Sequence, residues 1–246
     1  MSPIFIIAKK DVKEAFRSKS TYIYILFLFV ISIPYLDGSR NVIAGLLQQK
    51  MSPAQLQLNT QLFLNTVVNT LPLVLTMLFC SFLSTYAVIT DKAKRTLESL
   101  LATPVSLRQL WWGKSMAVAI PSIAITCLIL LLAILAINLI VIVPATGVFL
   151  IPSAPSLVAG LVIAPVMVFF IVCIVTFLQL IMTNPRIANF AFMAIFLGIY
   201  FTTITEQVSF GNLSLVYLIV AIVLAAVTFL LSRWLNKERV VLSSKG

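Results

Sequence analysis

The sequence contains no histidine, only three cysteines and only seven acidic residues among its 246 positions. Without histidine, the chain cannot build the His-dependent zinc sites or the Ser-His-Asp triads that many hydrolases use. Cys80, Cys127 and Cys173 all fall inside strongly apolar stretches, which is typical of small buried hydrophobes rather than of a disulfide framework. We therefore expect no metal site and no catalytic residue.

Charge is scarce as well, since 10% of the residues are charged and 61% are hydrophobic. Several apolar runs reach the ~20 residues that a helix needs to cross a bilayer. These runs are continuous rather than alternating, so a β-barrel is excluded and the backbone must satisfy its polar groups as helices. The composition predicts an all-α membrane protein, with residues 1–246 forming one transmembrane domain.

Six membrane spans are expected from the apolar runs and the polar segments between them. They cover Tyr22 to Leu36, Thr66 to Ile89, Trp111 to Val143, Ser156 to Met182, Ile187 to Thr205 and Leu213 to Trp234. Ser52 with Pro53 and Gln55 predicts a capped helix start before the second span, and Ser106 with Gln109 predicts another before the third. Pro34, Pro72, Pro121 and Pro165 fall within or at the edges of spans, where each permits a kink.

Fifteen of the 17 Lys and Arg residues fall in segments that six spans place on one side. Only Arg40 and Lys50 fall opposite, so the positive-inside rule predicts a multi-pass protein of the cell membrane with both termini in the cytoplasm. The net charge of +10 is thereby explained by membrane orientation, and no nucleic-acid partner is expected. The tail, residues 235–246, is predicted to be cytoplasmic.

The first 19 residues predict an amphipathic helix on the membrane surface. Apolar residues recur on one face of this helix, and its other faces carry Lys and Arg residues and Glu14. The apolar residues are Phe5, Ala8, Val12, Ala15 and Phe16. A simple basic flank of the first span is the alternative.

A polar interruption between the second and third spans predicts a second cytoplasmic helix, in residues 91–106. Ala93, Leu97, Leu100 and Leu101 recur at helical spacing and form one apolar stripe, which ends at Pro104. Lys92, Arg95, Glu98 and Ser99 occupy the other face. We expect this helix to contact a cytoplasmic partner.

The third span begins with two tryptophans followed by Gly113-Lys114-Ser115. This triplet imitates the end of a phosphate-binding loop, but Arg108 stands where the first glycine is required and no strand precedes it. We therefore expect neither a nucleotide site nor enzymatic activity. Trp111, Trp112 and Lys114 are predicted to anchor the span, with the indoles at headgroup level and the ammonium reaching outward.

No acid or base falls at the middle of any predicted span, which argues against a proton-coupled carrier. Neutral polar residues of the second and fifth spans are candidates for lining a pathway, although helix–helix hydrogen bonds explain them equally well. The candidates are Asn65, Asn69, Ser81, Ser84, Asn189 and Thr202.

The order of these parts resembles the membrane subunit of type-2 ABC exporters. That family carries a T-L-E-x-L-L pattern, a small residue, a P-[VIL]-S turn and a G-K pair in the same connection, and this chain has Thr96 to Ser106 and then Gly113-Lys114. The chain departs from the family at Arg95, where glycine is common. The resemblance implies a six-helix permease that pairs with a second copy and with two ATP-binding subunits, which bind the ATP and magnesium.

By this resemblance, six residues of the connection contact the ATPase, and the chain itself binds no cofactor. They are Arg95, Leu97, Glu98, Leu100, Leu101 and Pro104. The weakly charged spans favour an amphipathic or hydrophobic substrate such as a peptide, lipid or drug. Two other functions stay open: a scaffold that binds a cytosolic partner without transport, and an ATP-independent carrier, for which no convincing internal repeat is seen.

Overall fold

The computed structural model describes residues 3–48, 52–93, 105–182, 184, 187, 188, 190, 194 and 210–234. The regular structure of these residues is helical, with no strand. The helices are α1 (Pro3–Arg17), α2 (Lys19–Gln48), α3 (Pro53–Ser84), α4 (Thr90–Ala93), α6 (Leu107–Ile137), α7 (Val143–Thr146), α8 (Ala154–Val158), α9 (Ala164–Ile181) and α11 (Phe210–Trp234). Three π-helical turns, η1 (Thr85–Ile89), η2 (Asn138–Ile142) and η3 (Ala159–Ile163), join some of them into longer rods.

Five of these rods are long and apolar enough to cross a membrane. They are Lys19–Gln48, Pro53–Lys92, Leu107–Thr146, Ala154–Ile181 and Leu215–Trp234, and they match the first, second, third, fourth and sixth predicted spans. The chain is therefore an all-helical protein of the membrane type, as predicted. The fifth predicted span, Ile187 to Thr205, lies outside the described residues except for four positions.

Both predicted helix starts are confirmed as capping boxes. The Ser52 side chain accepts from the Gln55 backbone N–H while the Gln55 side chain accepts from the Ser52 N–H, and Ser106 and Gln109 make the same exchange. These exchanges satisfy N–H groups that a helix start leaves unpaired. At the other end of the third span, Gly147 closes α7 in the left-handed conformation (φ 71°), which suits glycine.

The first two spans are longer than their apolar runs. α2 continues past Leu36 through the polar residues that follow it and ends at Gln48. Within this part, Ser39 donates to the Leu36 carbonyl and Arg40 lies 4.0 Å from Asp37. The polar residues that follow the first apolar run therefore belong to the same helix.

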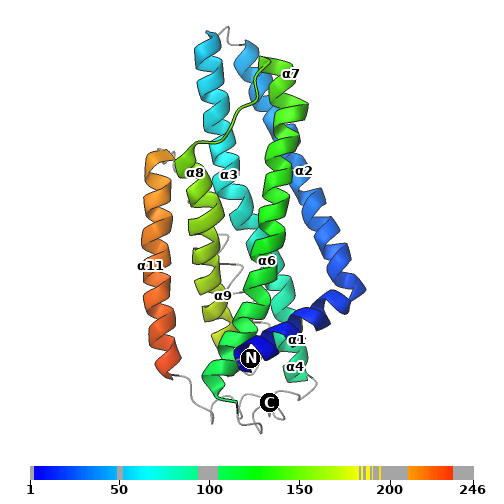
Figure 1. Ribbon diagram of the computed structural model, residues 1–246, viewed down its shortest axis with the longest axis vertical. Helices are drawn as coiled ribbons and strands as arrows, with labels where there is room; N and C mark the ends of the chain where they lie inside the picture. Colours follow the sequence, from blue (N-terminus) through cyan, green and yellow to red (C-terminus); the bar gives the residue numbers. More distant parts are fainter. Residues whose placement is uncertain are drawn as a thin grey trace.

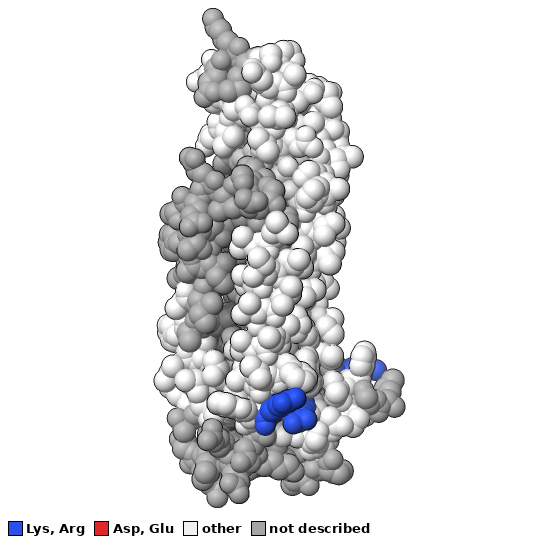
Figure 2. All heavy atoms as spheres, turned by 90° about the vertical axis from the view of Figure 1, so that its left-hand side faces the viewer, with Lys and Arg blue, Asp and Glu red and all other residues white. Residues whose placement is uncertain are grey.

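The rods stand roughly side by side, and α1 lies across one end of the bundle (Figure 1). α3 packs against α2, α6 and α9, and α9 packs against α11. α1, α4, the start of α6 and the end of α11 share one end of the molecule (Figure 1). On the face in Figure 2, the visible Lys and Arg side chains gather at that end.

Residues 3–17 form a helix, and one of its faces is buried against the bundle, while its place on a membrane surface stays a prediction. Ile7, Asp11 and Ala15 are buried, whereas Phe5 is 61% exposed. The rod of α8, η3 and α9 approaches α3 closely at Gly160, where an added Cβ would collide with the Val68 carbonyl oxygen. Only glycine allows this approach.

Candidate functional site

Lys114 lies two turns inside α6 and has no exposed surface. Its Nζ is 2.6 Å from Asp91 Oδ2 and 3.2 Å from Asp11 Oδ2, and it also donates to the Ala87 carbonyl oxygen. The ammonium has three N–H donors, and these three acceptors match them. We call Asp11, Asp91 and Lys114 the ion triad.

Each member of the ion triad comes from a different part of the chain. Asp11 is on the buried face of α1, Asp91 is in α4 at the end of the second span, and Lys114 is in α6. Ala87 belongs to the π-helical turn η1, where the ordinary pattern of i to i+4 hydrogen bonds is interrupted. The triad thus joins α1, the end of the second span and the start of the third.

The two carboxylates share a single cation, and both are buried, with 7% of Asp11 and 6% of Asp91 exposed. Burial raises the pKa of Asp11 above its ordinary value of 3.8; Lys114 opposes this shift and Asp91 reinforces it. A buried charge is tolerated only when it is paired and hydrogen-bonded. The Lys114 ammonium is therefore the group that allows both acids to be buried.

A glycine lets α1 reach this position. A Cβ on Gly113 would lie 3.0 Å from the Ile7 Cβ and 3.1 Å from the Ile4 carbonyl oxygen, closer than nearly all real contacts of this kind. The side-chain-free Gly113 therefore brings α1 against α6, and the next residue supplies the cation. Gly113 and Lys114 thus both serve the contact between α6 and α1.

Two further bonds tie the same end of the bundle to α9. Lys92 Nζ donates to the Met182 carbonyl oxygen over 2.7 Å, where α9 ends. Trp111 Nε1 donates to the Cys173 carbonyl oxygen over 2.8 Å. Lys92 was predicted on the polar face of a cytoplasmic helix, but it is buried, because its ammonium meets the carbonyl end of α9.

The predicted anchoring role is wrong for Trp111 and Lys114 and stays a prediction for Trp112. Trp111 and Lys114 have no exposed surface, and the half-buried Trp112 stacks on Phe169 at 6.0 Å between ring centroids. The buried partners Asp11, Asp91 and the Cys173 carbonyl explain the difference. Polar atoms with partners inside the bundle do not need to reach the headgroups.

The six residues predicted to contact an ATPase lie outside the described residues. They are Arg95, Leu97, Glu98, Leu100, Leu101 and Pro104. The structure does describe what lies on either side of them. Asp91 precedes the segment and Lys114 follows it, and these two residues are bonded to each other.

Of the pathway candidates, Asn65, Ser81 and Ser84 have partners within the protein. Asn65 Oδ1 accepts from the Ser153 N–H over 2.8 Å, which fixes the loop before α8. Ser81 donates to the Met77 carbonyl, and the Ser84 hydroxyl accepts from Gln179 Nε2 over 3.2 Å. These bonds between or within helices account for the polarity without a substrate.

Asn69 is different, because its side-chain amide is buried and has no hydrogen-bond partner among the described residues. Its backbone carbonyl accepts from the Tyr217 hydroxyl over 3.4 Å. A buried amide without hydrogen-bond partners is energetically unfavourable. Asn69 therefore stays a candidate for lining the pathway. Asn189 and Thr202 lie outside the described residues.

Within the described part of the chain, no group of three or more His, Cys, Asp or Glu side chains could hold a metal ion. No family model matches the chain, and the search of curated proteins finds no match either. Its function therefore has to be argued from its own residues.

Proposed function

We propose that this chain is the permease subunit of an ATP-driven exporter of the type-2 ABC class. A second copy would complete the translocation pathway, and two separate ATP-binding subunits would supply the energy. The proposal rests on the motif from Arg95 to Ser106 together with the ion triad. The expected substrate is an amphipathic or hydrophobic molecule, since the rods are apolar along most of their length.

The observation that carries the proposal is the bond between Lys114 and Asp91. It joins the two flanks of the motif, because Asp91 precedes the segment and Lys114 follows it. A force on a segment whose flanks could move freely would not be passed on to the spans. A force on this segment would be passed to the end of the second span, to the start of the third span and, through Asp11, to α1.

This arrangement suggests how ATP binding would be converted into opening of the bundle. Two ATPase subunits that come together on binding ATP would each displace the motif docked on them. The displacement would move the elements joined by the ion triad as one body, and so bias the bundle between inward- and outward-open states. The chain needs no nucleotide chemistry of its own for this role.

Replacing Leu100 and Leu101 together by Ala tests the docking step. If these side chains fill a groove of the ATPase, their loss should weaken binding by about 2–4 kcal/mol, or roughly 30- to 1,000-fold in affinity. The measurement is the affinity of the purified partner ATPase for the chain in nanodiscs. Leu58→Ala with Leu62→Ala, two exposed leucines near the start of α3, is the matched control.

Glu98→Gln tests coupling separately from docking, because it removes a charge and hardly changes the shape. We expect normal insertion and an ATP turnover that no longer responds to substrate. A scaffold would bind its partner through the same leucines but show no transport in vesicles. An unchanged affinity in the double Ala variant, with unchanged coupling in Glu98→Gln, would contradict the proposal.

A further inference from the structure

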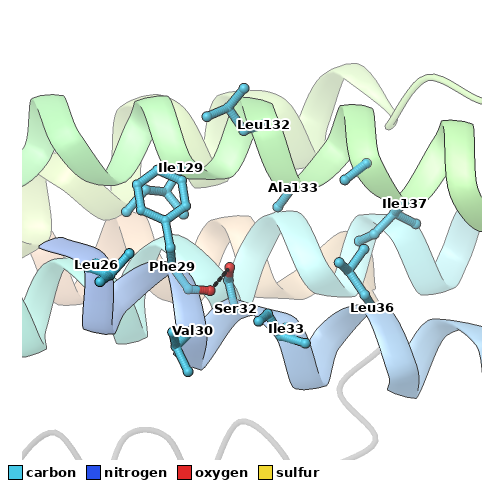
Figure 3. A pocket seen from close by; sticks show the side chains of 11 residues that line it. Leu26, Phe29, Val30, Ser32, Ile33, Leu36, Ile129, Leu132, Ala133 and Ile137 are labelled. Carbon is cyan, nitrogen blue, oxygen red and sulfur yellow. Dashed lines mark hydrogen bonds between the residues drawn. The ribbon is translucent and has the colours of Figure 1, made fainter.

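A groove of about 380 Å³ runs between α2 and α6, the first and third rods. Figure 3 shows Phe29 and Leu36 of α2 reaching toward Ile129 and Ile137 of α6. Ala133 and Ala136 are the smallest residues of its lining, and they leave the space that larger side chains would fill. Both helices are candidate membrane spans, so the groove lies at the depth of the hydrocarbon.

The side chains that line the groove are almost all apolar. Ten of the 11 lining residues are hydrocarbon side chains, and Ser32 donates its hydroxyl to the Phe29 carbonyl over 2.6 Å (Figure 3). The one polar group is therefore already satisfied. The occupant must be apolar over the whole length that it places in the groove.

The dimensions favour a single hydrocarbon chain over a helix. From Leu26 to Leu36 the groove extends for ~15 Å at the helical rise of 1.5 Å per residue. A helical segment of that length, about 10–12 Å wide with its side chains, occupies on the order of 1,000 Å³. The groove of about 380 Å³ is therefore too small to enclose a helix of a second copy.

A positive charge precedes the groove on the same helix. Lys19, Leu26 and Ile33 are spaced by seven residues, which places them along one face of α2. Lys19 is exposed at the first turn of α2, and the exposed Lys13 and Arg17 lie just before it at the end of α1. Lys19 therefore lies on the same face of α2 as the groove-lining residues Leu26 and Ile33.

The spacing also fits the length of a lipid. Leu26 is ~10 Å and Leu36 ~25 Å beyond Lys19 along the helix. Half of a bilayer, headgroups included, measures about 20–22 Å. A lipid with its headgroup beside Lys19 would therefore place in the groove the half of an acyl chain that lies nearer the centre of the bilayer.

We propose that the groove between α2 and α6 binds an acyl chain of an anionic lipid, whose headgroup is held by Lys19 and the neighbouring bases. This site belongs to the single chain and does not require that the chain transports anything. Lys10 is less available for the headgroup, because it lies 3.8 Å from Glu14. The charge of the bases selects an anionic lipid over a neutral one.

The test uses the full chain in nanodiscs with a phosphatidylglycerol that carries a photoreactive group in one acyl chain. After irradiation, the labelled residues are mapped by peptide mass spectrometry. We expect label on residues 26–36 and 129–137. Phosphatidylglycerol should label these residues about fivefold less in Lys19→Gln, since one base near an anionic headgroup has an effect of that size. A phosphatidylcholine with the same chain should label them more than about fivefold less, because it loses the attraction of every neighbouring base.

Ala133→Phe with Ala136→Phe fills the groove and should abolish the labelling. Leu131→Phe with Leu135→Phe, on the exposed side of α6, is the matched control and should keep it. Thermal unfolding midpoints are measured first, and Ala136→Phe alone is used if the double variant does not fold. Three results would overturn the proposal: unchanged labelling in the filled groove, label spread evenly over all exposed faces, or equal labelling by the two lipids.

Discussion

At the scale of single residues, replacement of Lys114 should lower the stability of the protein strongly. It is a buried cation held between two carboxylates, 2.6 Å from one and 3.2 Å from the other. Removing one member of such a network leaves the opposite charges buried without a partner. The stability of this end of the bundle should therefore depend on Lys114 more than on either acid.

Lys114→Met keeps the length of the side chain and removes its charge. We expect the free energy of unfolding to fall by about 3–5 kcal/mol, because Asp11 and Asp91 lose their shared partner. Unfolding in detergent, followed by denaturant titration, measures this change. Lys10→Met, which breaks an exposed pair with Glu14, is the control and should change stability by less than about 1 kcal/mol.

The triple variant Lys114→Met, Asp11→Asn, Asp91→Asn should recover most of the lost stability, because no unpaired charge remains. A Lys114→Met variant as stable as the unmodified chain would show that the ion triad does not hold α1 and the two spans together.

Asp11 should make stability depend on pH in a definite direction. Burial raises its pKa above 3.8, so the folded protein binds this proton more tightly than the unfolded chain does. The stability gained from binding this proton is fully present below pH 3.8. It is lost as the pH rises through the higher pKa that Asp11 has in the folded protein.

Asp11→Asn imitates the protonated acid and leaves the pair of Lys114 and Asp91 intact. The stability of this variant relative to the unmodified chain should therefore increase as the pH rises from about 4 toward 8. Thermal unfolding over this range checks the prediction. A difference that stays constant or decreases over the range would mean that Asp11 is not held in the buried environment described.

At the scale of helices, close contacts at glycine explain how the rods approach one another. Gly160→Ala should displace η3 from α3, because the added carbon meets the backbone oxygen of Val68, which cannot rotate away. We expect a loss of about 1–3 kcal/mol. Gly45→Ala in α2 meets no atom within 4 Å and should be neutral or stabilising by up to about 1 kcal/mol.

Unfolding free energies of the two variants, measured side by side, test this contrast. Equal changes in the two would show that helix propensity, rather than the contact with Val68, decides the outcome at Gly160.

The helices themselves could be predicted because their signals are local. Ser52 with Gln55 and Ser106 with Gln109 act within one turn, so sequence spacing alone identified both helix starts. The ion triad could not be identified in this way, since its members are separated by 103 and 23 positions. Pairing over such distances depends on how the rods pack.

One local signal did point to the triad. Ile7, Asp11 and Ala15 repeat every four residues, so an acid occupies the stripe that α1 buries. An acid in a buried stripe requires a cation, and Lys114 is the buried base of α6. Burial of Trp111 was missed because tryptophan near a span end usually marks the interface, and its bond to Cys173 comes from a distant span.

At the scale of the whole molecule, the direction of the rods is consistent with the six-span proposal. α9 and α11 both run toward the end that carries α1 (Figure 1). If both termini are in the cytoplasm, as the six-span proposal requires, single cysteines in a background without the three native thiols should label from outside near Lys50 and Gly211. Positions near Lys94, Arg186 and Lys245 should label only from the cytoplasm, and external labelling at Lys94 would refute the topology.

The proposed function depends most on the docking of residues 95–106 on an ATP-hydrolysing subunit. The most direct measurement places a photo-crosslinking amino acid at Leu100 of the full chain in its own membranes and identifies what it captures. We predict a crosslink to a subunit that binds and hydrolyses ATP, lost in Leu97→Ala with Leu101→Ala. Crosslinks only to lipid, to the chain's own spans or to a protein without ATPase activity would contradict the account.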